Sequence, residues 1–340
     1  MFTFSCWTFN KDYTMDEIIN KMNSSPNRVI SSECTITLNA KNGFDLDNPS
    51  TLSILGKSIR FISFKLSLPS NNQSIVKDVD VIVYEYDGKI KINSFRGFKT
   101  SQKLLRDYFN ELSGWSKVIS AAPEISEDLL YWLFKSYIDK SKTSSLDTNS
   151  FLYLHSLKRY KGVTKDQGNT LTGEGDRISD ILGTLAFLLD NDDLKLLKAQ
   201  MVYKTPEDFH SLVFEMKLTG TLKFDSSFYR GDFNFTGDKL TFALSILITN
   251  VIIPIVISSY KNAIQSTKWS PLIKRDFIER IGERIKERVD IELEKISAEI
   301  TPQCINPTVA TTSLDNLVPD DLDDLDDLDD LDDSGNDSDE

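Results

Sequence analysis

Residues 78–93 read DVDVIVYEYDGKIKIN, and this stretch is the clearest indication of the fold. Valine, isoleucine and tyrosine dominate its two halves, which is typical of β-strands. Between the halves lies Asp87-Gly88, a residue pair that a two-residue type I′ turn prefers. The stretch therefore predicts an antiparallel hairpin.

The strand pattern extends toward the N-terminus. Residues 35–40 read TITLNA and residues 60–68 read RFISFKLSL, in which apolar and polar side chains alternate. In the second segment the alternation puts four apolar side chains on one face, namely Ile62, Phe64, Leu66 and Leu68. Residues 34–93 therefore predict a set of antiparallel strands.

Three helical stretches follow these strands, at residues 101–112, 126–139 and 148–160. The second opens with Ser126, a favoured N-cap residue, and Glu127 and Asp128 suit the positive end of the helix dipole. Strands followed by helices predict an α+β fold with antiparallel sheets and packed helices.

A second group of elements lies beyond residues 161–175, KGVTKDQGNTLTGEG, whose four glycines predict a linker between two lobes. The first lobe then comprises residues 1–160 and the second residues 176–300. In the second lobe the apolar spacing predicts helices at 176–189 and 193–201, a β-meander at 211–235, and long helices at 238–267 and 271–300.

Composition predicts that these lobes have a packed core. Hydrophobic residues make up 40% of the chain, with 20 Phe and 11 Tyr, whereas disordered chains are poor in both classes.

Cys6, Cys34 and Cys304 are too few and too far apart for a disulfide framework or paired zinc ligands. Residues 1–17 lack the basic start of a secretory signal. The simplest location is a reducing cytoplasm.

The C-terminal residues 320–340 read DDLDDLDDLDDLDDSGNDSDE and carry twelve Asp and one Glu without Lys or Arg. Residues 1–314 hold 38 acids against 39 bases, so the net charge of −13 comes from the tail and not from the body. A run of like charges repels itself and buries little apolar surface. Residues 301–340 are therefore expected to be a disordered linker followed by a disordered tail.

Leucine at every third position gives this tail an apolar edge in a polyproline-like conformation. The tail is expected to bind a basic surface through the residues of the repeat: Asp320, Asp321, Leu322, Asp323, Asp324, Leu325, Asp326, Asp327, Leu328, Asp329, Asp330 and Leu331. Because its charge resembles that of a nucleic-acid backbone, it is expected to mimic or mask nucleic acid. A tail that only keeps the protein soluble is the alternative.

Residues 240–260, LTFALSILITNVIIPIVISSY, are uncharged and long enough to span a bilayer. Thr241, Ser245 and Thr249 recur on one side of this helix, and Pro254 lies in its middle. A helix that is apolar nearly all round also suits the centre of a soluble domain, which is the favoured interpretation. A membrane-associated protein is the alternative.

Residues 271–300 combine a narrow apolar seam with many charges. The seam consists of Ile281, Ile285, Val289, Leu293, Ile296 and Ile300. It predicts packing on one neighbour within the chain, or a short coiled coil in a homodimer. A basic ridge on the same helix consists of Arg280, Arg284 and Arg288. The ridge is expected either to pair with Glu279, Glu283 and Glu287 of the same helix or to bind the tail across its flexible linker.

An enzyme is the alternative to a binding protein. A divalent-metal nuclease needs an acidic residue on one strand and an acid-x-Lys triplet on the next. Two sets approach this pattern. One is Glu207 or Asp208 with Glu215 and Lys217, and the other is Asp78 or Asp80 with Asp87 and Lys89. Such triplets are frequent in a chain with 27% charged residues, and the histidines, His155 and His210, have no metal-ligand spacing. No catalytic residue, metal or cofactor is therefore predicted.

Together these features favour a cytoplasmic, non-enzymatic binding or regulatory protein with two lobes. Its acidic tail is expected to engage a basic surface, either on a partner protein or on the chain itself. A homodimer through residues 271–300 and direct binding of nucleic acid are further hypotheses that the sequence leaves open.

Overall fold

The computed structural model describes residues 1–31, 34–69, 76–139, 144–145, 150–163, 170–175 and 193–300. These residues contain both helices and antiparallel strands, which confirms the predicted mixture. The chain divides into two compact units, Met1–Val289 and Asp290–Glu340. The predicted helix at 176–189 and the acidic tail lie outside the described residues.

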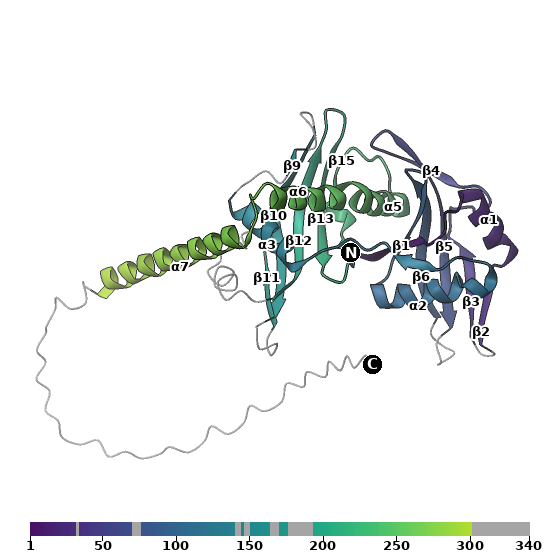
Figure 1. Cartoon of the computed structure of the whole chain (residues 1–340), viewed down its shortest axis with the longest axis horizontal. Coiled ribbons are helices and arrows are strands. Elements are labelled where there is room, and N and C mark those ends of the chain that lie inside the picture. Colours follow the sequence, from purple (N-terminus) through teal and green to yellow (C-terminus); the bar gives the residue numbers. More distant parts are fainter. Residues whose placement is uncertain are drawn as a thin grey trace, which may run out of the picture. The chain divides into compact units, whose positions relative to one another are not determined.

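The strands and helices alternate in groups along the described chain (Figure 1). The strands are β1 (Phe2–Phe9), β2 (Asn27–Ser31), β3 (Cys34–Ala40), β4 (Ser50–Ile54), β5 (Lys57–Pro69), β6 (Val76–Tyr86), β7 (Lys89–Ser94), β8 (Val118–Ser120), β9 (Ser144–Ser145), β10 (Phe151–Val163), β11 (Thr170–Glu174), β12 (Asp193–Lys204), β13 (Phe209–Lys217), β14 (Leu222–Phe224) and β15 (Arg230–Gly231). The helices are α1 (Met15–Ser24), α2 (Phe98–Tyr108), α3 (Glu127–Ile138), α5 (Gly237–Leu247), α6 (Ile253–Gln265) and α7 (Pro271–Ile300), with short turns η1 (Glu111–Ser113), η3 (Ser226–Phe228) and the π-helical η4 (Ile248–Ile252).

Strand β1 joins two groups of strands into one antiparallel sheet. The order of the main path is β11-β10-β12-β13-β14-β1-β7-β6-β5-β3-β2. Residues 2–4 of β1 pair with β14, whereas residues 5–8 pair with β7. The start of the chain, which the sequence patterns left unassigned, therefore links the strands of both halves.

The predicted hairpin of β6 and β7 is confirmed. Asp87 and Gly88 have φ angles of 52° and 73°, and a type I′ turn requires positive φ at both central residues. On the neighbouring β5, Ile62, Phe64 and Leu66 are all buried, as their alternation predicts.

Local capping residues fix two helices. Ser126 is the N-cap of α3, and its hydroxyl accepts a hydrogen bond from the Leu129 amide at 3.1 Å, which confirms the predicted helix start. Helix α1 was not predicted, although Thr14 and Glu17 form a capping box at its start.

Two segments that the spacing predicts as helices are strands. Residues 148–160 contain most of β10, and residues 193–201 form the start of β12. The pairing of these two strands shifts register at three places. Two of the shifts leave an extra residue in β10 and the third leaves one in β12, which interrupts the alternation of each strand. The buried apolar side chains of β10 are Leu152, Leu154, Leu157 and Tyr160. Bulges thus give this strand the spacing of two and three residues that resembles a helical pattern.

The predicted linker at 161–175 has strand residues on both sides of its undescribed centre. Residues 159–163 of β10 pair with residues 170–174 of β11. Gly173 lies opposite Tyr160, and a Cβ on this glycine would lie 2.2 Å from the Tyr160 ring. Glycine at this position therefore allows the ring to pack across the hairpin. The lobe limits drawn from the sequence stay a prediction.

The predicted meander at 211–235 is found in part. Strands β13 and β14 pair in antiparallel fashion, with Phe214 opposite Phe224. Strand β15 is only two residues long, and Phe233 and Phe235 lie outside any strand. Both rings instead pack against the edge of the core cluster.

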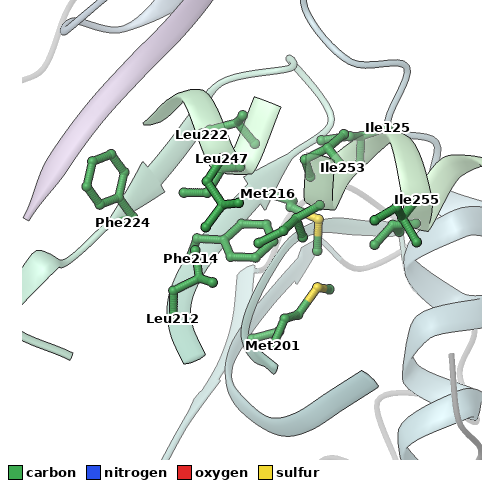
Figure 2. Close-up of a cluster of buried hydrophobic side chains, with 14 of the residues drawn as sticks. Ile125, Met201, Leu212, Phe214, Met216, Leu222, Phe224, Leu247, Ile253 and Ile255 are labelled. Atoms are coloured by element: carbon green, nitrogen blue, oxygen red, sulfur yellow. The ribbon is translucent and has the colours of Figure 1, made fainter. Parts of the chain in front are cut away.

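Helices α5 and α6, joined by η4, form one continuous helical stretch, Gly237–Gln265, which crosses the strands in Figure 1. Among the described residues it is the only helix long and apolar enough to cross a membrane. Of its 18 consecutive residues with the highest hydropathy, 67% are buried in the protein. Figure 2 shows Leu247 and Ile253 facing Phe214 and Met216 of β13. Most of this apolar stretch is therefore buried in the protein, while the choice between a soluble and a membrane-associated protein stays a prediction.

Polar side chains of this helix have partners on the strands that it covers. Asn93 of β7 donates a hydrogen bond to Ser245 Oγ at 3.1 Å, and Asn250 donates to Tyr84 Oη at 3.0 Å. Lys91 Nζ donates to the side-chain oxygen of Asn250. Because buried polar groups are costly unless they are hydrogen-bonded, these contacts explain how Ser245 and Asn250 fit into an apolar core helix.

The first half of α7 belongs to the core of the first unit. Phe277 and Ile281 are buried, and Ile285 is partly buried against the same cluster. In the described part of the second unit, Leu293 and Ile296 are 55% and 51% exposed. Packing within the chain therefore accounts for Ile281 and Ile285 of the predicted seam, while a homodimer through residues 271–300 stays a prediction.

Candidate functional site

The residues of the nuclease hypothesis do not converge. Asp208 precedes β13 and Glu215 lies near its far end, so at ~3.4 Å per residue the two are separated by ~24 Å along the strand. Asp80 and Asp87 of the other set pair with lysines at 2.8 and 2.7 Å. Among the described residues, no three His, Cys, Asp or Glu side chains group closely enough to hold a metal ion.

A pocket of about 380 Å³ beside α6 includes Cys6, Thr249 and Lys261. Burial raises the pKa of Cys6 to about 12, and the opposing influence of Lys91 is smaller. The thiol therefore stays protonated at neutral pH, and it is not an activated nucleophile.

The two histidines have different surroundings. His155 is exposed on β10, whereas His210 of β13 is fully buried. Its Nδ1 lies 2.9 Å from the Tyr229 hydroxyl, and its Nε2 has no hydrogen-bond partner. Burial lowers the pKa of His210, while Asp208 and Asp232 oppose this effect. The side chain is thus held in its neutral form inside the protein.

We expect His210 to make the protein less stable in mild acid. In the unfolded chain this histidine takes up a proton below a pKa of ~6.5, whereas the folded protein keeps His210 neutral to a lower pH. The free energy of unfolding is therefore unaffected by His210 above pH ~6.5. Below that pH it falls, until the lower pKa of the folded state is reached. The slope contributed by one such group is at most ~1.4 kcal/mol per pH unit. Urea titrations between pH 7.5 and 5.5 should show a smaller loss for His210→Gln than for the wild type. Equal slopes in the two proteins would contradict this assignment.

One arginine of the basic ridge of α7, Arg280, forms a salt bridge within the fold. Arg280 donates hydrogen bonds to both carboxylate oxygens of Asp139, at 3.1 and 3.3 Å, and Asp139 directly follows α3. Glu279, a predicted intrahelical partner, lies 3.4 Å from Arg275 instead. Arg280 therefore ties α7 to α3, and binding of the tail to the ridge with Arg284 and Arg288 stays a prediction.

One side of the sheet carries a row of bases that we call the basic face. It consists of Arg159 and Lys161 of β10, Lys198 of β12, Lys217 of β13 and Lys223 of β14. Across the strands, Lys198 lies opposite both Arg159 and Glu215, and Glu215 lies opposite Lys223. Residues directly opposite in antiparallel strands point to the same side, so these side chains share one face. The other face of the same strands packs into the core.

Glu215 is the buried centre of the basic face. Its side chain is 1% exposed, and Lys217 Nζ and Lys223 Nζ each lie 3.9 Å from its Oε1. Neither carboxylate oxygen has a hydrogen-bond partner. Burial, followed by repulsion from Lys223, lowers the pKa of Lys217. On the same side of the sheet Glu174 lies opposite Arg159, and the five bases outnumber the two glutamates and leave the face with a positive charge.

A pocket of about 570 Å³ adjoins the basic face. It is lined by His155 and Lys158 of β10, Glu174 and Gly175 at the end of β11, Lys198 and Gln200 of β12, Val213 of β13, and Ser227, Phe228 and Arg230 beyond β14. Lys198 therefore belongs to both the pocket and the basic face. Among the described residues of the lining, Glu174 is the only carboxylate, and it lies 3.9 Å from Arg159.

The sequence patterns did not indicate the basic face or the pocket. The bases come from segments between residues 159 and 230, and only strand pairing brings them together. A signal was present, because Lys198 lies between the buried Leu197 and Ala199, and Lys223 lies between Leu222 and Phe224 in the same way. Such lysines point outward if the segments are strands, but the first segment was predicted as a helix.

The candidate site is defined by charge and shape on one side of an antiparallel sheet. Comparisons with protein-family models and with curated proteins found no match. The proposed function therefore rests on the residues of this chain.

Proposed function

We propose that the chain is a regulatory protein that binds nucleic acid on its basic face, and that its acidic tail competes for this face. The observation that carries the proposal is the gathering of five bases from four strands around the single buried carboxylate of Glu215. Lys and Arg side chains bind phosphate backbones because the contact releases condensed counterions. No chemical step is part of this function.

The repeat of the tail matches the spacing of the bases. In an extended polyproline-like chain, three residues span ~9 Å, so aspartate pairs recur at this interval. Lys198 and Lys223 lie on β12 and β14, which flank β13, and alternate strands of a sheet are ~9.5 Å apart. A tail lying across the strands would bring one aspartate pair to each lysine, which supports competition with a phosphate backbone.

Deletion of residues 320–340 is expected to strengthen the binding of nucleic acid by roughly tenfold at ~50 mM salt, because a tethered competitor is removed. The gain should shrink at ~300 mM salt, since the competition is electrostatic. Fluorescence anisotropy with a labelled oligonucleotide measures both affinities. The melting temperature should be nearly unchanged, because the sequence predicts no core-forming pattern in the tail.

Two variant tails of unchanged length separate the contribution of the aspartates from that of the leucines. A tail in which every Asp of residues 320–331 is replaced by Asn should behave like the deletion, whereas replacing its four leucines by Ser should leave most of the competition in place. Equal binding by full-length and truncated protein at low salt would remove the competition from this proposal. Absence of binding by every form would remove nucleic acid as the ligand.

A partner protein is the other place where the tail could find bases. The test above decides between the two, because a tail directed only at a partner does not weaken binding of nucleic acid by its own chain. A cytoplasmic location is part of the proposal, and it rests on the few and widely separated cysteines.

A further inference from the structure

The pocket beside the basic face has a fixed polar floor. Ser156 Oγ donates to Gln200 Oε1 at 3.2 Å, and Gln200 Nε2 donates to Ser211 Oγ at 2.9 Å. These bonds hold the Gln200 amide against the sheet, beside the buried side chain of Val213. A ligand therefore meets a preformed surface with one apolar and one amide group.

One wall of the pocket is an exposed aromatic ring on a rigid turn. Phe228 is the last residue of η3, and it is 57% exposed. Asp225 Oδ1 accepts hydrogen bonds from the Ser227 amide at 3.0 Å and from its hydroxyl at 2.7 Å. The Phe228 amide donates to the Asp225 carbonyl at 3.2 Å. The backbone is thus fixed while the ring stays in solvent, which is the arrangement of a stacking platform.

The charges around this ring favour an anion. Lys198 and Arg230 come from β12 and β15 on the two sides of β13, and Lys158 adds a third base. In the part of the lining that the structure describes, Glu174 is the only carboxylate. Asp225 lies outside this lining, and the turn of η3 holds its carboxylate. A ligand with a flat aromatic part and a phosphate therefore suits both the ring and the bases.

We propose that this pocket binds an unpaired nucleobase stacked on Phe228, while Lys198 and Arg230 contact its phosphate, so that the protein binds single-stranded in preference to duplex nucleic acid. The inference rests on the proposed function, because Lys198 links the pocket to the basic face. In a duplex the bases are paired and stacked inside, so a base enters such a pocket only from a single strand.

The test compares a labelled oligothymidylate of about 12 nucleotides with a duplex of the same length, using tail-deleted protein at ~100 mM salt. Phe228→Ala should weaken single-strand binding by roughly 5- to 100-fold and leave duplex binding unchanged, because stacking on one base is lost. Phe228→Trp should retain binding, whereas Phe228→Leu, which keeps an apolar side chain without a ring face, should not. Unchanged melting temperatures show that all three variants are folded.

The variant Lys198→Gln/Lys223→Gln separates this inference from the proposed function. It should weaken single-strand and duplex binding alike, because it removes contacts to phosphate. If it does so while Phe228→Ala binds both ligands as the wild type does, the basic face stands and the nucleobase pocket is overturned. If an acidic peptide with the sequence of residues 320–331 is bound but neither oligonucleotide is, both proposals are wrong and the face binds acidic protein segments.

Discussion

Replacing Ile248 by aspartate is expected to unfold the first unit of the protein. Ile248 is fully buried at the start of η4, within the cluster that joins the central helix to strands on both sides of β1. The change removes ~1.5–3 kcal/mol of apolar burial and leaves a carboxylate without a partner, which costs several kcal/mol more. Domains are stable by only ~5–15 kcal/mol, so the loss takes a large part of the total. Urea unfolding followed by tryptophan fluorescence and circular dichroism should show a loss above ~4 kcal/mol or no folded protein.

A matched change on the same helix provides the control. Ile264 of α6 is 45% exposed, and Ile264→Asp should alter the free energy of unfolding by less than ~0.5 kcal/mol. Wild-type stability of Ile248→Asp would show that this part of the helix is not in the core. Retention of the wild-type protein in membranes after carbonate washing would favour the membrane-associated alternative instead.

The second large effect concerns Lys198 and Lys223. Their combined replacement by glutamine should reduce affinity for single-stranded nucleic acid by roughly 25-fold at ~0.1 M salt, because each lost phosphate contact costs about fivefold at this ionic strength. The slope of log K against log salt should become shallower by ~1.4. Glutamine is the better test than glutamate, since two new carboxylates beside the buried Glu215 would also disturb the fold.

A control with the same change in charge comes from two exposed lysines outside the basic face. Lys89 of β7 and Lys99 of α2 are both exposed, and Lys89→Gln/Lys99→Gln should leave both the affinity and the slope within twofold of the wild type. Equal losses for the two double variants would mean that net charge alone attracts nucleic acid. The basic face would then have no special role.

Much of the fold could be predicted where a few neighbouring residues fix the backbone. Asp87-Gly88 sets the turn between β6 and β7, and Ser126 sets the start of α3, through φ angles and hydrogen bonds that involve only adjacent residues. The long apolar run of α5 and α6 predicted a buried helix, because its length and lack of charge leave few other places for it. Because these features depend on neighbouring residues or on composition, they can be predicted from the amino-acid sequence alone.

Strands β10 and β12 could not be predicted in the same way. Their spacing resembles a helix because bulges break the alternation, and the bulges arise only when the two strands pair. The missed strands also hid the basic face, whose lysines share one side only in a sheet. The amino-acid sequence thus established the hairpin, the capped helix, the central apolar helix and the acidic composition of the tail, since each depends on neighbouring residues. Only tertiary structure placed Arg159, Lys198 and Lys223 around Glu215, because the pairing of strands from distant segments decides which charges become neighbours.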